Sequence, residues 1–205
     1  MAKLLVATNN PGKVREYEEL LEDLPPSLEF TFPAKEGLTL EVDESGETFE
    51  ENARLKARAY AQASDLLTLA DDSGLEVDAL GGAPGVRSAR YAGPDADDVD
   101  RYRKLLKALA GVPTEKRSAR FHCVVALALP DGTVYSADGV CEGEICNDPR
   151  GEHGFGYDPI FIVRGYNGRT MAELPPDVKN QISHRARALL AIQPKLMEVI
   201  LDSGF

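Results

Sequence analysis

Short apolar runs and helical repeats of apolar residues follow one another at the start of the chain. Residues 3–7 form an apolar run that predicts a buried strand, and residues 8–12 are typical of a turn. A helix is predicted from Lys13 to the Pro25-Pro26 pair, which ends it. The apolar positions of this helix are Val14, Tyr17, Leu20, Leu21 and Leu24. The pattern indicates a strand, a turn and a helix in succession.

The middle of the chain predicts two further helices with a buried strand between them. Thr48-Phe49-Glu50-Glu51 is a capping box, and the helix that it opens extends to about residue 64. The apolar run 66–70 predicts a buried strand that ends in an acidic turn, Asp71-Asp72-Ser73-Gly74. A Gly-Pro loop follows at 81–85, and residues 97–110 predict a helix.

The second half of the chain is richer in predicted strands. They cover residues 121–129, 133–137 and 139–145, and Asp131-Gly132 predicts a hairpin between the first two. Residues 154–159 form a glycine-rich loop. The remaining predicted features are an apolar segment at 160–163, helix caps at Thr170 and Ser183, and a kink at Pro194.

Helices and strands alternate early in the chain and strands cluster late, which favours an α/β fold with a mixed sheet and helices on both faces. A chain of 205 residues is long enough for a substantial core. It shows no repeat, no low-complexity tract and no linker long enough to separate domains. We therefore expect residues 1–205 to form a single domain.

Composition and charge narrow the class of protein. The formal charge of −11 repels polyanions, so DNA and RNA are not expected partners, although a small anion held by local cations is compatible with it. No apolar run approaches the ~20 residues of a membrane span, and the first residues are too soon polar for a signal peptide. Three cysteines cannot all pair, and their spacing fits neither a redox nor a zinc motif. The cytoplasm is the expected compartment.

The acidic turn at Asp71-Asp72 is the most informative candidate for chemistry. Ligands bind at the carboxyl ends of strands in open α/β sheets, and a buried carboxylate there needs a cation. A metal ion carrying phosphate is a cation that also does chemistry. The alternative is an ordinary turn, because Asp, Ser and Gly all favour turns. Residues outside this segment have to decide between the two readings.

The turn Thr8–Lys13 offers a second candidate, for binding an anion. Backbone N–H groups at a helix start and the charge of Lys13 together suit phosphate. The segment is not a P-loop, because Val14 follows the lysine and the P-loop pattern is absent. The alternative is a simple Asn-Pro-Gly turn with a solvated lysine.

Acidic and basic side chains also meet around the second helix. Asp43-Glu44-Ser45-Gly46 is a further acidic turn, with a solvated loop as the alternative. Asn52 and Lys56 lie at i and i+4 and share a helix face next to small alanines, so this face points partly inward. Lys56 is then placed for an anion, or it snorkels to solvent.

The last third of the chain carries a candidate site for a flat ring. Residues 155–158 set two aromatic rings and a carboxylate between glycines, which suits stacking on a ring while a polar group reads its edge; a structural turn is the alternative. Lys179, Ser183, His184 and Arg185 gather near a helix start, where the dipole disfavours cations. They indicate an anionic or electron-rich partner, or a surface charge cluster.

Six of these segments together carry a family resemblance. They are Thr8–Lys13, Thr48–Ala57, Ala70–Leu75, Gly81–Gly85 with Ser88–Tyr91, Gly154–Phe161 and Ser183–Arg185. In this order and at this spacing they resemble the inosine triphosphate pyrophosphatase family over nearly the whole chain. The family's enzymes hydrolyse the noncanonical purine nucleoside triphosphates XTP, ITP and dITP to the monophosphate and pyrophosphate.

The resemblance implies a fold and an activity. The implied fold is a two-lobed α/β structure, with a long central mixed sheet flanked by helices and a deep active-site cleft. The implied protein is a Mg²⁺-dependent enzyme of nucleotide house-cleaning and a homodimer, with a small nucleotide as its substrate and neither nucleic acid nor membrane as a partner. Breaking the α–β phosphoanhydride needs in-line water and charge neutralisation, which agrees with the acidic and basic segments above.

The resemblance also implies roles for individual residues. Asp72 corresponds to the proton acceptor and a magnesium ligand, and Ser73 to a substrate contact. Asp43 corresponds to the second metal carboxylate, with Glu44 or a bridging water as alternatives. Lys56 and Arg90 are weaker candidates for triphosphate contacts. The phosphate-binding residues would be Thr8, Asn9, Asn10, Pro11, Gly12 and Lys13, and the base-binding residues Phe155, Gly156, Tyr157, Asp158, Lys179, His184 and Arg185.

Two other functions remain compatible with the sequence. One is a binding protein that senses nucleotides without turnover, which would release no pyrophosphate from ITP. The other is a phosphatase that removes the terminal phosphate and releases orthophosphate. The Asp71-Asp72 pair lacks the D-x-D spacing of aspartyl-phosphate phosphatases, which disfavours the phosphatase.

Overall fold

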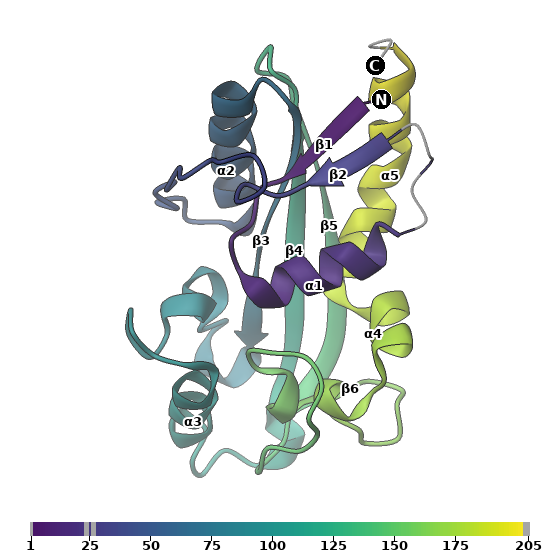
Figure 1. Ribbon diagram of the computed structural model, residues 1–205. Coiled ribbons are helices and arrows are strands. Elements are labelled where there is room, and N and C mark those ends of the chain that lie inside the picture. The colour runs from purple at the N-terminus through teal and green to yellow at the C-terminus, as the bar shows by residue number, and fades with distance from the viewer. Residues whose placement is uncertain (1, 23–24, 26–27, 203–205) are drawn as a thin grey trace. The chain divides into compact units, whose positions relative to one another are not determined.

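The computed structural model describes residues 2–22, 25 and 28–202 (Figure 1). Two predicted features of the first helix, Leu24 and Pro26, lie outside the described residues. The chain folds as two compact units. Unit 1 comprises residues 1–72, 123–139 and 185–205, and unit 2 comprises residues 73–122 and 140–184.

The secondary structure confirms the predicted α/β class. The α-helices are α1 (Pro11–Leu20), α2 (Phe49–Ser64), α3 (Asp98–Ala108), α4 (Pro176–Ile182) and α5 (His184–Asp202). The strands are β1 (Ala2–Val6), β2 (Leu28–Thr31), β3 (Leu67–Val77), β4 (Ser118–Ala128), β5 (Val134–Ile145) and β6 (Phe161–Val163). They form one sheet in the order β2-β1-β3-β4-β5-β6. The sheet is mixed, because β1 is parallel to β2 and β3 whereas β5 and β6 are antiparallel.

Unit 1 packs helices on both faces of its strands. Leu4 and Val6 of β1 belong to the same buried cluster as residues of α1 and α5, whereas Leu5 between them is buried outside that cluster. Because side chains alternate along a strand, Leu5 faces the opposite side. The buried face of α2 covers that side with the small residues Ala53, Ala57 and Ala61. In Figure 1, α2 and α5 lie to either side of β1 and β2.

Unit 2 has its own hydrophobic core, which joins the ends of β3, β4 and β5 with β6 and α3. Leu75, Leu105, Phe121, Ile145 and Phe161 are among its buried members. Short 3-10 turns connect its elements, and they are η1 (Asp78–Leu80), η2 (Gly85–Arg90), η3 (Thr114–Lys116), η4 (Asp158–Ile160) and η5 (Met171–Glu173). Tyr157 and Ile160 belong to this core, which therefore anchors the segment 155–160 that carries four of the predicted base-binding residues.

Most predicted boundaries are confirmed within one or two residues. Thr48 caps α2 through a complete capping box, and Asp97 caps α3. The predicted hairpin is present, with Gly132 donating its N–H to the carbonyl of Leu129 at 3.0 Å. Thr170 forms the predicted cap of η5, and Pro194 lies inside α5.

Three predictions, about one helix, one strand and one turn, are wrong. The first helix covers Pro11–Leu20 instead of extending from Lys13 to the Pro25-Pro26 pair. It begins earlier because proline fits the first helical position and Asn10 supplies the cap. Val134–Ile145 is one strand rather than two, so Gly139 does not break it. The segment Asp71–Gly74 is not a turn, because β3 continues through it to Val77. Tertiary contacts override the turn preference of these residues, since both carboxylates are buried against partners described below.

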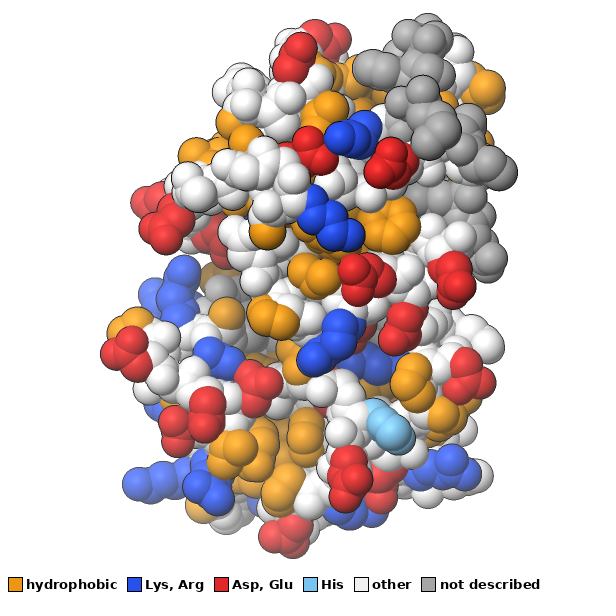
Figure 2. All heavy atoms as spheres, in the orientation of Figure 1, with side chains coloured by type: hydrophobic (Ala, Val, Ile, Leu, Met, Phe, Trp, Pro, Cys, Tyr) orange, Lys and Arg blue, Asp and Glu red, His pale blue; other side chains and the backbone are white. Residues whose placement is uncertain are grey.

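The surface carries charges of both signs. On the face shown in Figure 2, Lys and Arg side chains are interspersed with Asp and Glu instead of gathering in one large basic patch. Among the described residues, no helix combines the length and the apolar character that crossing a membrane requires.

Candidate active site

The turn after β1 is built as a helix start with an organised cap. The side chain of Asn10 accepts hydrogen bonds from the N–H groups of Gly12 and Lys13, at 2.8 and 3.1 Å. The hydroxyl of Thr8 accepts one from the N–H of Asn10, at 3.2 Å. Asn9 and Pro11 are exposed. The segment is therefore a capped helix start with Lys13 in its first turn, and its phosphate-binding role stays a prediction.

Asp71 lies at the centre of a buried ion cluster in unit 1. Its Oδ2 atom lies 2.9 Å from Nζ of Lys13 and 3.1 Å from a guanidinium nitrogen of Arg185, which also pairs with Glu16. Burial alone would raise the pKa of Asp71, but Lys13, Arg185 and Lys56 outweigh burial and hold the pKa well below its ordinary value. Asp71 is therefore ionised at neutral pH and fixes the direction of the Lys13 side chain.

Asp72 points the other way. Successive side chains of a strand face opposite sides of the sheet, so Asp72 faces α2, whereas Asp71 faces α1 and α5. Nδ2 of Asn52 in α2 donates to Oδ2 of Asp72 at 3.0 Å. Burial raises the pKa of Asp72, and nearby Lys13 and the Asn52 hydrogen bond only partly offset this effect. A buried carboxylate with a raised pKa is typical of a group that accepts a cation or a proton.

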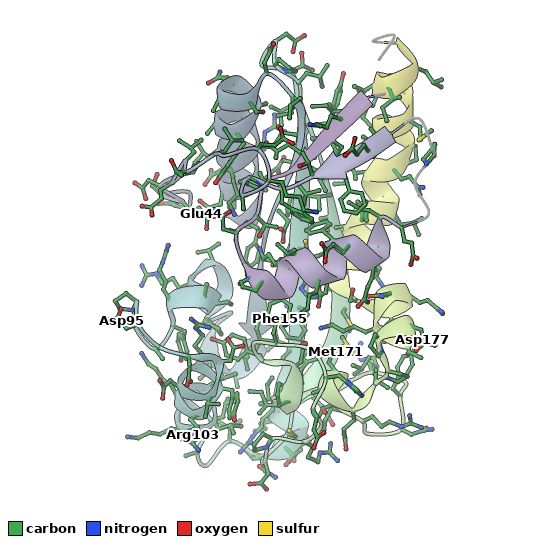
Figure 3. The ribbon with its side chains drawn as sticks, in the orientation of Figure 1. Glu44, Asp95, Arg103, Phe155, Met171 and Asp177 are labelled. Carbon is green, nitrogen blue, oxygen red and sulfur yellow. The ribbon has the colours of Figure 1, made fainter. Side chains whose placement is uncertain are left out.

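The loop before α2 brings a further carboxylate to Asp72. Glu44, labelled in Figure 3, pairs with Lys56, and its charge contributes to the raised pKa of Asp72. Nζ of Lys56 also donates to the backbone carbonyl of Asp71, at 3.0 Å. Burial would lower the pKa of Lys56, but Asp71 and Glu44 outweigh burial and raise it. Asp43, the predicted second metal carboxylate, is exposed, whereas Glu44 is half-buried.

Within unit 2, the loop before η4 is ordered by a buried ion pair. Oδ2 of Asp158 accepts the N–H of Phe155 at 2.9 Å and lies 2.5 Å from Nζ of Lys179. The same ammonium lies 5.2 Å from the centre of the Phe155 ring, which is labelled in Figure 3. Gly154 has φ +77°, and a Cβ there would collide with the Asp158 carboxylate, so only glycine fits. Three predicted base-binding residues, Phe155, Asp158 and Lys179, are therefore in direct contact.

The other predicted residues of unit 2 are held by the surrounding elements. The N–H of Gly156 donates to Oδ2 of Asp98 at 2.8 Å, and the hydroxyl of Tyr157 donates to the carbonyl of Ser88 at 2.9 Å. His184 stacks on Phe121, with ring centroids 4.8 Å apart. Ser73 follows Asp72 in β3 and is half-buried, and Arg90 is exposed at the end of η2.

Arg185 differs in placement from its predicted neighbours in the base-binding set. It belongs to unit 1, is about 1% exposed, and carries the ion pairs to Asp71 and Glu16. Its guanidinium also lies 5.8 Å from the centre of the Tyr17 ring. These contacts favour a role in positioning Asp71, and its predicted contact with a base stays a prediction.

Comparison with known proteins assigns the family. The profile of the Ham1 family matches residues 4–195. The chain belongs to the Ham1 family. A protein of Desulforamulus reducens named dITP/XTP pyrophosphatase is 52% identical over 200 residues, which cover 97% of this chain and 95% of that protein. A Bacillus subtilis protein of the same name is 50% identical over 198 residues, covering 97% of this chain and 98% of the relative.

Solved structures agree with the Ham1 assignment. A HAM1 protein from Coxiella burnetii matches with a TM-score of 0.85 and 46% identity, over 97% of this chain and 100% of that one. Together with the named relatives, this match confirms the resemblance and the α/β fold that the six motifs indicated. The roles of the individual site residues stay predictions.

Sequence analysis of this Ham1 chain left two residues out of the candidate site and named a third, Glu44, only as an alternative. It treated Asp71 as part of a turn, left Asn52 without a role, and preferred Asp43 over Glu44. A strand through Asp71-Asp72 would have signalled opposite-facing carboxylates, because side chains alternate along a strand. The spacing of Asn52 and Lys56 showed that they share an inward face, but no pattern in the sequence names Asp72 as the partner of Asn52.

Proposed function

We propose that this protein is a nucleoside triphosphate pyrophosphatase that hydrolyses dITP, XTP and ITP to the monophosphate and pyrophosphate. The printed names of its relatives support this activity. The structural observation that carries the proposal lies in unit 1. There, the carboxylates of Asp72 and Glu44 and the ammonium groups of Lys13 and Lys56 meet around two adjacent residues of β3. Such a set suits a metal-bound polyphosphate.

Mg²⁺ is the proposed cofactor, and Asp72 and Glu44 would hold it. Among the described residues, no three His, Cys, Asp or Glu side chains form a metal cluster. Mg²⁺ does not need one, because it is usually held by one or two carboxylates together with substrate phosphates and water. Asp72 fits this requirement, because burial disfavours its ionised form and a bound cation would stabilise that form. Charge neutralisation on the phosphate oxygens is the chemistry that Mg²⁺ supplies when bound.

In this proposal the residues of unit 1 act on the triphosphate. The ammonium of Lys13 at the start of α1 binds phosphate oxygens, and Lys56 provides a second cation. Asp72 accepts the proton of the attacking water at the α-phosphorus, as a general base. The ion pairs of Asp71 set the position of Lys13 before substrate binds.

Lys13→Ala is expected to lower kcat/KM for dITP by about 10- to 150-fold, because one charge-assisted hydrogen bond to phosphate is lost. Steady-state kinetics with saturating Mg²⁺ measure the effect. Arg15→Ala is the control, since Arg15 is an exposed cation on the same helix. Unchanged kinetics for Lys13→Ala would show that the loop binds phosphate through its backbone, or that it binds none.

The residues of unit 2 are proposed to select the base. Phe155 would stack on the purine, and the His184 side chain would donate to its 6-oxo edge. Hypoxanthine and xanthine carry that acceptor next to an N1–H donor, whereas adenine reverses both. Donors that stay unsatisfied against adenine can reject it by as much as ~10⁴-fold. Guanine keeps the 6-oxo edge and differs by its 2-amino group, whose buried N–H donors would cost ~1–3 kcal/mol each if unpaired.

The comparison of kcat/KM for ITP, XTP, GTP and ATP tests the proposed function. We expect ITP and XTP to be the best substrates, GTP to be the nearer competitor and ATP the poorest. Binding of ITP without release of pyrophosphate would favour a nucleotide sensor instead. Equal activity on all four triphosphates would remove the role proposed for unit 2.

The assembly and the compartment complete the proposal. We take the functional form to be a homodimer in the cytoplasm that acts on a small nucleotide and binds no nucleic acid. The charge of −11 supports the absence of nucleic acid as a partner, and the three buried cysteines, which form no disulfide among the described residues, support a reducing compartment. Light scattering after gel filtration measures the mass of the assembly, and a monomer would contradict the dimer.

A further inference from the structure

Asn52 connects the loop that carries Glu44 to the carboxylate of Asp72. It is 1% exposed and lies in the first turns of α2. Its Oδ1 atom accepts the N–H of Gly46 at 2.8 Å, and its Nδ2 atom donates to Oδ2 of Asp72 at 3.0 Å. One buried amide therefore contacts both segments that carry the proposed metal ligands, and all of these residues belong to unit 1.

The chemistry of the two partners fixes the orientation of this amide. A backbone N–H can only donate, so the side-chain oxygen must face Gly46. The side-chain NH₂ group then faces Asp72, which accepts when it is ionised. A rotation by 180° would set the oxygen against a carboxylate and the NH₂ group against an N–H. The Asn52 side chain therefore stabilises the ionised form of Asp72, and its hydrogen bond goes to one carboxylate oxygen of Asp72, Oδ2.

The close approach of the loop to Asn52 depends on Gly46. A Cβ at this position would lie 2.7 Å from Oδ1 of Asn52 and 2.7 Å from Cβ of Glu51. Any larger residue would push the loop away from α2. Because Glu44 is two residues before Gly46, such a shift would also move the Glu44 carboxylate relative to Asp72.

We propose that Asn52 is a positioning residue that holds the loop 43–46 and Asp72 in one fixed arrangement for binding the metal. The proposal rests on the proposed function, since it assigns Asp72 and Glu44 as the ligands. Asn52 itself contacts neither metal nor substrate. It acts through the direction of the Asp72 carboxylate and through the distance between the two ligands. Hydrogen-bonding partners of this kind are worth about 10- to 100-fold in metal affinity or activity when they are removed.

Two variants perturb the two contacts of Asn52 separately, the one with Asp72 and the one with Gly46. Asn52→Asp keeps an acceptor for Gly46 and the volume of the side chain, but it sets a second carboxylate against Asp72. Gly46→Ala keeps the amide of Asn52 and displaces the loop. Matched controls change the same chemistry elsewhere. Gln62→Glu converts an exposed amide of α2 to a carboxylate, and Ser45→Ala changes an exposed residue of the same loop.

The test uses three measurements. Electron paramagnetic resonance measures the binding of Mn²⁺ without nucleotide, steady-state kinetics give kcat and KM for dITP, and thermal unfolding gives the stability. For Asn52→Asp we expect kcat to fall by about 10- to 100-fold with KM changed far less. For Gly46→Ala we expect Mn²⁺ binding to weaken by about 10- to 100-fold. The two controls should match the wild type in all three measurements.

Several results would overturn the proposal. If Asn52→Asp lowers only the melting temperature and retains wild-type kcat below it, Asn52 has a structural role alone. If Gly46→Ala binds Mn²⁺ as the wild type does, the loop and Asp72 are not coupled through Asn52. Failure of the proposed function looks different, because the wild type itself would then release no pyrophosphate from dITP.

Discussion

Asp72→Asn is expected to abolish nearly all turnover and to leave the protein at least as resistant to unfolding as the wild type. Turnover falls because the variant loses both the proposed general base and a proposed ligand of the metal. A loss of several kcal/mol in the barrier corresponds to a rate lower by about 10³-fold or more. Stability is retained because burial raises the pKa of Asp72, so the ionised side chain destabilises the folded state at neutral pH.

The measurement pairs kcat for dITP with the midpoint of urea unfolding at neutral pH. Asp95→Asn is the control, because Asp95 is an acidic side chain in another part of the chain, labelled in Figure 3. More than about a tenth of the wild-type kcat, only ~1.4 kcal/mol of barrier, would assign the general base elsewhere. A large loss of stability in Asp72→Asn would contradict the expectation that ionised Asp72 destabilises the folded state.

Asp71→Asn is expected to differ from Asp72→Asn, because its main effect should be a loss of stability. Asp71 receives Lys13 and Arg185 at one carboxylate oxygen, and Arg185 is almost fully buried. Removal of one partner from a buried ion pair leaves an uncompensated charge and typically costs about 3–5 kcal/mol. Glu16 still pairs with Arg185, which places the expected loss near the lower end.

Urea unfolding of Asp71→Asn and Asp72→Asn in one experiment tests this contrast between neighbours in β3. The slope of the transition should stay the same in both, so that midpoints report stability. If Asp71→Asn unfolds at the wild-type midpoint, the cluster of Lys13, Arg185 and Glu16 is not a source of stability. The side chain of Asp71 would then have to be explained by substrate binding alone.

Local rules were sufficient to predict the elements of this fold that depend on nearby residues. The capping box at Thr48, the hairpin at Asp131-Gly132 and the early helices are set by contacts within a few residues in sequence. Asp71-Asp72 needed more than local rules. Turn preference pointed to a loop, whereas β3 continues because distant residues supply partners for the two carboxylates, Lys13 and Arg185 for one and Asn52 for the other.

The residues of the candidate site differ in the same way in how far the sequence could predict them. The loop 8–13 and the loop 155–158 could be recognised because glycine, proline and cap residues mark them in sequence. The choice between Asp43 and Glu44 could not be made, because adjacent acidic residues in a loop have no periodicity that tells which one points inward. In the structure Glu44 is half-buried and pairs with Lys56, whereas Asp43 is exposed, and the choice of metal ligand between them stays a prediction.

The products of dITP in ¹⁸O-labelled water show whether hydrolysis occurs between the α- and β-phosphates, with water attacking next to Asp72. Phosphorus NMR and mass spectrometry identify the products and locate the label. We expect dIMP and pyrophosphate in equal amounts, with the ¹⁸O atom in dIMP. Primary formation of dIDP and labelled orthophosphate would contradict it.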